Sequence, residues 1–571
     1  MTDKSVRMMS PSLRHYAILS LFATFEFGAA INHPPVIHTA CGLLAGYDQR
    51  VQFSDMTVSV YAGIPFAAAP IGLLRFHPPV PYPHCPWKGV RYSIPTLSCV
   101  HHADGVVGKE DCLFLNVVVP SGSNINSSLP VIVYFHGGNL IHGDAFGELP
   151  NCYALASQQN VICITASYRL SVLGWLATPD LAQEQNGSAG NLGTRDALAS
   201  LAWVKNNIAS FGGDPSRVVI SGQSSGGTLV FSLMAATFSS NDGSLFTGAI
   251  SLSGSPNISM QTSEKFSQDA SIVETLGCAN QSSAELRLRC LRSLSPEAIL
   301  NAEPGSWGTP GIFGTSLLPP PTQNGMQYAG IVYVDGVLIE SSFVNALAYG
   351  VNGDVGLIIS NMAAEPDGGP GMNVRGMTDT HFRDAMGTML SEWSDTNNTV
   401  NNILTLYANE TNIDVQLAYD SLVADYGLTC AGLTIANILT ASNARTAPVY
   451  LLYNAWSPSK NASDGSSKWP AHGLDWDEIG WSWDFNDPAK SDFEAAALLQ
   501  QMFGDFARNR GIMPASWNWA PATAVKVTTL VFADNNSSWP GGGVREEVNW
   551  HTKQCNGLVA LGFNPLYWWC D

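Results

Sequence analysis

The stretch "VVISGQSSGGTLV", Val218 to Val230, places a serine between two glycines directly after an apolar, β-branched run. In a chain rich in glycine and serine, a Gly-x-Ser-x-Gly pattern by itself supports a nucleophile only weakly, so its structural context must decide. The run before Ser224 is typical of a buried strand, and the run after it, "GGTLVFSLMAATF", is typical of a helix. This strand-turn-helix order predicts a nucleophile elbow, in which Gly222 and Gly226 make the tight turn possible.

Short apolar runs recur along the chain, and their continuous apolarity is typical of strands buried on both faces. They cover residues 129–138, 160–170, 217–223, 248–255, 355–360 and 447–456. The stretch 194–211 has apolar residues three and four positions apart, which indicates a helix. The alternation predicts an α/β fold with a large, mostly parallel sheet flanked by helices, and no internal repeat or long linker divides it.

The chain has 571 residues and a formal net charge of −19. This acidic balance argues against nucleic acid as a partner, because such binding needs a basic face that displaces phosphate counterions. Anionic lipid would repel the chain as well. Beyond the N-terminal region no segment reaches the length of uninterrupted apolar sequence that a membrane span needs, so we expect no membrane span.

Residues 1–30 are similar to a secretory signal peptide, because Lys4, Arg7 and Arg14 precede the apolar run "YAILSLFATF" and small residues follow it. A frayed N-terminal helix is the alternative, since Glu26 lies close to the apolar run. The remaining residues, 31–571, are expected to form a single domain. We therefore expect a signal peptide at 1–30 and a secreted mature protein.

Two further features favour export. Asn-x-Ser/Thr sequons carry glycans only in the secretory route. The chain has sequons at Asn126, Asn186, Asn257, Asn280, Asn397, Asn409, Asn461 and Asn535. Its 11 cysteines lack the paired C-x-x-C spacing of a zinc site, which favours disulfides in an oxidising compartment and leaves at least one thiol over.

A serine hydroxyl needs a base, and in the usual chain order of this elbow the acid and then the histidine follow the serine. Three histidines follow Ser224. His381 lies in a helix-like stretch and His551 lies among polar residues near the C-terminus, so both are expected at the surface. His472 follows a strand that ends near Trp456, where a loop can approach the elbow. We therefore predict His472 as the base.

The acid is expected at the end of another strand, between the serine and the histidine. Glu365 and Asp367 both lie just beyond the strand predicted at 355–360. Glu365 is preferred, because Asp367 sits in a Pro-Asp-Gly turn, where Asp commonly caps the backbone. A solvated loop is the alternative interpretation for both residues.

Acyl transfer also needs donors for a tetrahedral oxyanion. The glycine-rich stretch "YFHGGNL" follows an early predicted strand and is similar to a loop that supplies one backbone N–H, beside the N–H of the residue after the nucleophile. The predicted donors are the backbone N–H groups of Gly138, Asn139 and Ser225.

Five stretches spread over nearly the whole mature chain share one family pattern. They are "YAGIPFAAAPIGLLRFHPP", "EDCLFLNVVVP", "GNLGTRDALASLAWVKNNIASFGGDPSRVVISGQSSGG", "YVDGVLI" and "HGLDWDEIGW". Together they resemble the type-B carboxylesterase and cholinesterase family of α/β-hydrolases, which includes secreted fungal esterases. The resemblance implies the α/β-hydrolase fold, a triad of Ser224, Glu365 and His472, and no metal or organic cofactor.

The resemblance also implies structural partners. Ser253 is similar to a residue that contacts the acid of the triad. The implied disulfides are Cys99 with Cys112, Cys278 with Cys290 and, less directly, Cys430 with Cys555. The pairing of the other cysteines, Cys41, Cys85, Cys152, Cys163 and Cys570, stays open, as does the oligomeric state.

The chain departs from the family pattern at the site. Gln223 and Ser225 flank the serine where the family usually has Glu and Ala, so one negative charge is missing. Asn139 stands where Gly or Ala is usual, and its side chain is expected to narrow the acyl site. The loop between Cys99 and Cys112 is shorter than the lid of related lipases and lacks the choline-stacking Trp of cholinesterases. A small-molecule ester with a short acyl or aromatic group therefore fits better than triglyceride or acetylcholine.

These observations predict a serine carboxylic-ester hydrolase in which His472 deprotonates Ser224, an acyl-enzyme forms, and activated water releases the acid. A non-catalytic adhesion relative is one alternative, disfavoured because a full triad is present. An acyltransferase that passes the acyl group to an alcohol of a secondary metabolite is another, since acceptor choice depends on pocket shape.

Overall fold

The computed structural model describes most of the chain after its N-terminal region. It covers residues 35–39, 42–82, 87–103, 105–237, 244–308, 331–367, 373–391, 395–459, 469–482, 488–533 and 543–563. The signal peptide expected at 1–30 lies outside the described residues. So do Cys41, Cys85, Cys570 and the sequons at Asn461 and Asn535.

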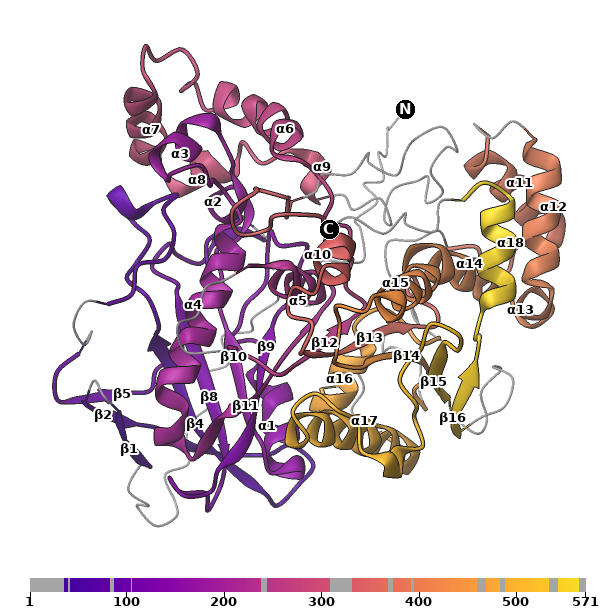
Figure 1. The fold of residues 1–571 in the computed structure, drawn as a ribbon, viewed down its shortest axis with the longest axis horizontal. Helices are drawn as coiled ribbons and strands as arrows, with labels where there is room; N and C mark the ends of the chain where they lie inside the picture. Colours follow the sequence, from indigo (N-terminus) through magenta and orange to yellow (C-terminus); the bar gives the residue numbers. More distant parts are fainter. Residues whose placement is uncertain are drawn as a thin grey trace, which may run out of the picture.

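An eleven-stranded sheet organises the fold, in the order β16-β15-β14-β13-β12-β11-β9-β10-β8-β4-β3 (Figure 1). Neighbouring strands from β15 through to β10 in this order are parallel, whereas β16 at one edge and β8, β4 and β3 at the other pair antiparallel. The strands are β3 (Tyr47–Arg50), β4 (Thr57–Pro65), β8 (Phe114–Pro120), β9 (Leu129–Phe135), β10 (Ile162–Ala166), β11 (Gly213–Gln223), β12 (Gly248–Leu252), β13 (Gly356–Met362), β14 (Val449–Ala455), β15 (Thr528–Ala533) and β16 (Gly543–Val548). The large, mostly parallel sheet predicted from the sequence is confirmed.

The six strands predicted from apolar runs correspond to β9, β10, β11, β12, β13 and β14. Their apolarity reflects burial on both faces. Along β9, Val131 and Val133 belong to one hydrophobic core, whereas Ile132 and Tyr134 belong to another on the opposite face. The helix predicted at 194–211 is α4 (Leu192–Asn207), which continues as a 3₁₀ turn at Ile208–Phe211.

Helices cover both faces of the sheet (Figure 1). On one side α1, α16 and α17 pack on one another and on the central strands. On the other side α4 and α5 pack on β11, α5 also packs on β12, and α10 packs on α5. Their bounds are α1 (Leu149–Gln159), α5 (Ser225–Ala235), α10 (Phe343–Ala348), α16 (Leu474–Gly480) and α17 (Lys490–Arg508). This arrangement brings the ends of β11 and β13, and the loop after β14, to one edge of the sheet.

One helical run among the described residues, Val415–Ala441, is long and apolar enough to cross a membrane by length and composition. It comprises α14 (Val415–Ala424), a π-helical turn (Asp425–Thr429) and α15 (Cys430–Ala441). Because 83% of its most apolar window is buried inside the fold, the run has the character of a core helix.

Four disulfides are present in the described residues. Cys99–Cys112, Cys278–Cys290 and Cys430–Cys555 are the pairs that the family resemblance implied. The fourth, Cys152–Cys163, joins α1 to β10 and had stayed open at the level of sequence. The Cys430–Cys555 bridge links α15 to α18 (Thr552–Ala560) across 125 residues of sequence.

Candidate active site

Ser224 lies at the turn between β11 and α5, with φ 57° and ψ −128°. Small neighbours permit this turn. A Cβ atom on Gly222 would lie 2.3 Å from the backbone of Gly226, and a Cβ on Gly226 would lie 2.1 Å from the carbonyl oxygen of Phe135. A hydrogen bond to the neighbouring strand β12 holds the backbone of Ser224 in this strained conformation, because its N–H donates to Leu252 O at 2.8 Å. The local backbone is that of a nucleophile elbow.

Glu365 is 1% exposed and lies three residues beyond the end of β13. One carboxylate oxygen, Oε1, accepts from the backbone N–H of Met362 and from the hydroxyl of Ser253, both at 2.7 Å. The other oxygen, Oε2, lies 2.6 Å from Nδ1 of His472. These contacts fix the orientation of the carboxylate, which points at the imidazole.

His472 lies in the loop after β14, directly before α16. Its backbone N–H donates to Glu365 O at 3.1 Å, so main chain and side chain both link it to the acid loop. Gly473, with φ 88°, turns the chain into α16. The imidazole is thereby held with Nδ1 toward Glu365.

The other downstream histidines lie elsewhere. His381 is exposed in α11 (Asp379–Met389), as expected. The expectation that His551 lies at the surface is wrong, because His551 is buried and its Nδ1 lies 2.7 and 2.8 Å from the two carboxylate oxygens of Asp425. Tyr407 donates to the same carboxylate at 2.9 Å. The partner comes from a distant π-helical turn, which local polarity could not reveal.

Asp367 is also buried, so the alternative of a solvated loop is wrong for both carboxylates. Asp367 accepts from the backbone N–H of Trp469 at 2.6 Å and pairs with the guanidinium of Arg375. These contacts hold the backbone on which His472 sits. The contacts of Glu365 therefore favour it as the acid, and those of Asp367 favour a structural role.

The side chain of Gln223 reaches the other ring nitrogen of His472. Its amide lies 3.1 Å from Nε2. In the orientation that satisfies the backbone donors, Gln223 Oε1 accepts from the N–H groups of Ser224 and Gly473, each at 3.3 Å, and it faces Nε2, from which it accepts when the imidazole is protonated. Gln223 thus connects the elbow to the loop that carries the histidine.

The glycine-rich loop after β9 lies directly against the elbow, since a Cβ on Gly137 would come within 3.0 Å of Ser224 Cβ. Gly138 and Asn139 both have positive φ angles, 107° and 55°. Within the described part of the chain, no acceptor pairs with the backbone N–H of Gly138, Asn139 or Ser225. Three donors at the elbow are therefore available, as an oxyanion site requires.

Neighbouring side chains hold this loop in place. Leu140 donates its backbone N–H to Ser225 Oγ at 3.0 Å and accepts from Trp175 Nε1 at 3.1 Å. His136 stacks on Tyr168, whose hydroxyl donates to the backbone carbonyl of His136 at 2.7 Å. Burial lowers the pKa of His136 and that of His142 to about 4 each. Both imidazoles therefore stay neutral near pH 7 and add no charge beside the elbow.

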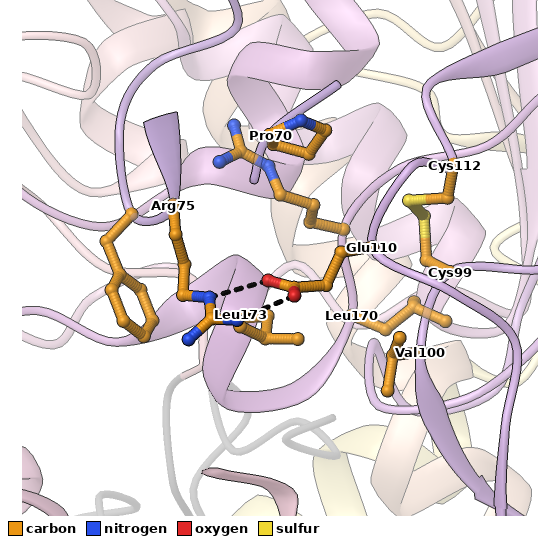
Figure 2. Close-up of a pocket in the computed structure, with 10 residues that line it drawn as sticks. Pro70, Arg75, Cys99, Val100, Glu110, Cys112, Leu170 and Leu173 are labelled. Atoms are coloured by element: carbon orange, nitrogen blue, oxygen red, sulfur yellow. Dashed lines mark hydrogen bonds and ion pairs between the residues drawn. A yellow bond between two sulfur atoms is a disulfide. The ribbon is translucent and has the colours of Figure 1, made fainter. Parts of the chain in front are cut away.

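A small pocket lies behind the loop between Cys99 and Cys112 (Figure 2). There Arg75 binds both carboxylate oxygens of Glu110, at 2.6 and 2.7 Å, and donates to Leu294 O at 2.6 Å. The pocket lining includes no residue of the proposed triad. Its ion pair and disulfide fix the base of the loop.

One residue near the site escaped the sequence reasoning. Asp475 follows His472 by three positions and is buried in the first turn of α16. This helix has only 7 residues, too few for a periodic pattern to show which side chains are buried. Within the described residues, no group of three or more His, Cys, Asp or Glu side chains is placed to hold a metal ion.

A family model described as the carboxylesterase family matches residues 33–551. Carboxylesterase 1C of Rattus norvegicus is 37% identical over 289 residues, which cover 47% of this chain and 50% of that protein. Cocaine esterase of Homo sapiens is 35% identical over 302 residues, covering 50% of this chain and 52% of that protein. The matched segment thus spans about half the length of these relatives.

Solved structures share the architecture. A structure named PNB esterase superposes with a TM-score of 0.67 at 22% identity, covering 92% of this chain and 99% of that chain. At this identity the similarity concerns the fold, and it confirms the expected α/β-hydrolase fold. Because the family match extends over most of the sequence, the chain belongs to the carboxylesterase family.

Proposed function

We propose that this protein is a serine carboxylic-ester hydrolase in which Ser224 is the nucleophile, His472 the base and Glu365 the acid. The observation that carries the proposal is the contact of the buried Glu365 carboxylate with His472, 2.6 Å apart, at the same sheet edge as the strained Ser224 turn. Family membership and the esterase names of its relatives support the reaction class.

In the proposed reaction Ser224 Oγ attacks the ester carbonyl while His472 Nε2 takes its proton. Glu365 holds Nδ1 of the ring and stabilises the imidazolium that forms. The oxyanion receives hydrogen bonds from the N–H groups of Gly138, Asn139 and Ser225. The imidazolium then protonates the leaving alcohol, and water deprotonated by His472 releases the acid from the acyl-enzyme.

The proposed substrate is a small or aromatic carboxylic ester. Asn139 stands at the donor loop with a larger side chain than the Gly or Ala that is usual in the family, and Leu140, which is fully buried, holds the loop in place. This leaves less room for a bulky acyl group than a glycine would.

We also propose that the protein is secreted and glycosylated. Four disulfides are present, and five of the six sequon asparagines in the described residues are exposed; these five are Asn126, Asn186, Asn280, Asn397 and Asn409. Asn257 differs, because it is only partly exposed and its Oδ1 accepts from the hydroxyl of Ser259 in its own sequon at 2.7 Å.

A fluorophosphonate probe tests the reaction class. The full chain, expressed in a eukaryotic host and collected from the medium, should gain the mass of one adduct, on the tryptic peptide that contains Ser224. An excess of a short-chain aromatic ester should slow labelling, and heat-unfolded protein should not react. Enzymatic removal of N-glycans from the same sample should lower its mass. An adduct on another serine, or none, would contradict the assignment; full retention in the cells would contradict secretion.

Gln223 offers a test of the electrostatics at the base. In Gln223→Glu the new carboxylate lies where the amide now meets His472 Nε2, 3.1 Å away. A negative charge there stabilises the imidazolium, so the base stays protonated to higher pH and the acid limb of the kcat/KM profile should move up by about one pH unit. An unmoved limb, with both proteins folded and active, would show that position 223 is not coupled to the base.

A further inference from the structure

A second buried carboxyl group, that of Asp475, follows His472 closely in the chain. Asp475 is 1% exposed and lies in the first turn of α16, three residues after His472. Its Oδ1 accepts from the backbone N–H of Trp476 at 2.9 Å, whereas its buried Oδ2 has no hydrogen-bond partner within the described residues. A buried carboxylate is costly without a partner, so the charge on Asp475 depends on what surrounds it.

The surroundings of Asp475 are almost entirely acidic or neutral. Glu365, beyond β13, and His472 are its electrostatic neighbours, and the positive charge available among them is that of the imidazolium. The other titratable groups packed around α16 are Tyr134 of β9, Glu148 beside α1, Asp477 and Glu478 of α16 itself, and Asp492 of α17. Burial, and next the charge of Glu365, raise the pKa of Asp475 to about 7, while His472 acts in the opposite direction.

The chain lacks a carboxylate on the other side of the imidazole, because Gln223 occupies the position next to Nε2. The backbone of α16 fixes Asp475 relative to the ring, since the N–H groups of Trp476 and Asp477 donate to Gly473 O at 3.1 and 3.3 Å. A charge on Asp475 therefore acts on His472 from a fixed place.

We propose that Asp475 is a positioning residue that acts through His472, with a carboxylate that stabilises the imidazolium formed when Ser224 gives up its proton. The inference rests on the proposed function of the triad. Asp475 touches neither the ester nor Ser224. It adds a negative charge above about neutral pH and none well below it, so the rate enhancement that it provides grows with pH.

Asp475→Asn tests the inference, because Asn has the shape of the protonated acid and never ionises. At pH 6 the kcat/KM of the variant should lie within about twofold of the wild type, since the side chain at position 475 is then mostly uncharged in both proteins. At pH 8.5 the wild type should be faster by about five- to tenfold. A ratio that is constant between these pH values, or a ratio of one throughout, would overturn the proposal.

Asp477→Asn is the matched control. Asp477 lies on the same helix and is partly exposed, and its Oδ1 accepts from the hydroxyl of Ser482 at 3.3 Å. Its variant loses one negative charge but should show the same ratio to wild type at pH 6 and pH 8.5. A pH-dependent loss equal to that of Asp475→Asn would assign the effect to the net charge of α16 and overturn the specific role.

If Asp475→Asn does not fold, the pH profile of kcat/KM for the wild type tests the inference instead. Two coupled ionisations, those of His472 and Asp475, should shape kcat/KM between pH 5 and about 8. A fit that needs a single ionisation would overturn the inference. If the triad assignment were wrong, the Ser224→Ala variant would remain active. This result distinguishes failure of the proposed function from failure of the inference about Asp475.

Discussion

Ser224→Ala should lower kcat/KM for an aromatic ester by about a million-fold and leave the fold intact. Loss of the nucleophile removes the acyl-enzyme route, and only transition-state binding by the oxyanion donors remains. The elbow itself should persist, because alanine keeps the Cβ and the backbone N–H of Ser224 still donates to Leu252 O. Steady-state kinetics with thermal unfolding followed by circular dichroism would measure both parts.

Ser225→Ala is the matched control for that variant. It removes a hydroxyl one position away, including the acceptor of the Leu140 N–H, but keeps the backbone donor of residue 225. Its turnover should fall by no more than about tenfold, the cost of one lost hydrogen bond behind the donor loop. Comparable activity in Ser224→Ala and the wild type, with both folded, would reject Ser224 as the nucleophile.

Glu365→Gln should reduce kcat by about three to four orders of magnitude. Met362 N–H and Ser253 Oγ–H converge on one carboxylate oxygen, and His472 approaches the other. A carboxamide has one oxygen, and we expect this oxygen to accept the hydrogen bond from the buried backbone N–H of Met362. The NH₂ group then faces Nδ1, which must become an acceptor. The ring is left with its proton on Nε2, where it cannot take the proton of Ser224.

Asp367→Asn separates this effect from simple disturbance of the acid loop. The variant keeps an acceptor for the Trp469 N–H but weakens the pair with Arg375. It should lose about 1–3 kcal/mol of stability, while kcat per folded molecule stays within about tenfold. Unfolding curves and active-site titration would distinguish the two. The opposite ranking, with Asp367→Asn inactive and Glu365→Gln active, would move the acid to Asp367.

The local chemistry of the elbow could be predicted because each requirement is a property of neighbouring residues. The tight turn needs small residues at positions 222 and 226, where the chain has Gly222 and Gly226. The strand before the turn and the helix after it are recognised from their apolar residues. The strands that the sequence left unpredicted lie mainly toward the sheet edges, such as β3, β4 and β16. Of these, β3 and β16 are the two edge strands, and their mixed burial weakens the apolar pattern.

Contacts between distant segments could not be predicted in the same way. Local sequence supplied a Pro-Asp-Gly turn as the reason to prefer Glu365 over Asp367, whereas the structure supplies the contacts of each carboxylate. His551 looked like a surface residue because its neighbours are polar, yet it is buried against Asp425, 126 residues earlier. The fold determines which charged groups lie next to a titratable side chain, and the distance between two residues in the sequence does not show whether they are in contact.

The sequence by itself determined the α/β class, the order of the central strands along the chain, the elbow at Ser224 and a short set of candidate partners, because these follow from periodicity, glycine placement and chain order. Only the tertiary structure decided which carboxylate contacts His472, that Gln223 contacts its other ring nitrogen, and that Asp475 is buried three residues after it. The physical reason is that pairing and burial of charge are set by the packing of β13, the loop after β14 and α16 against one another, which no local pattern encodes.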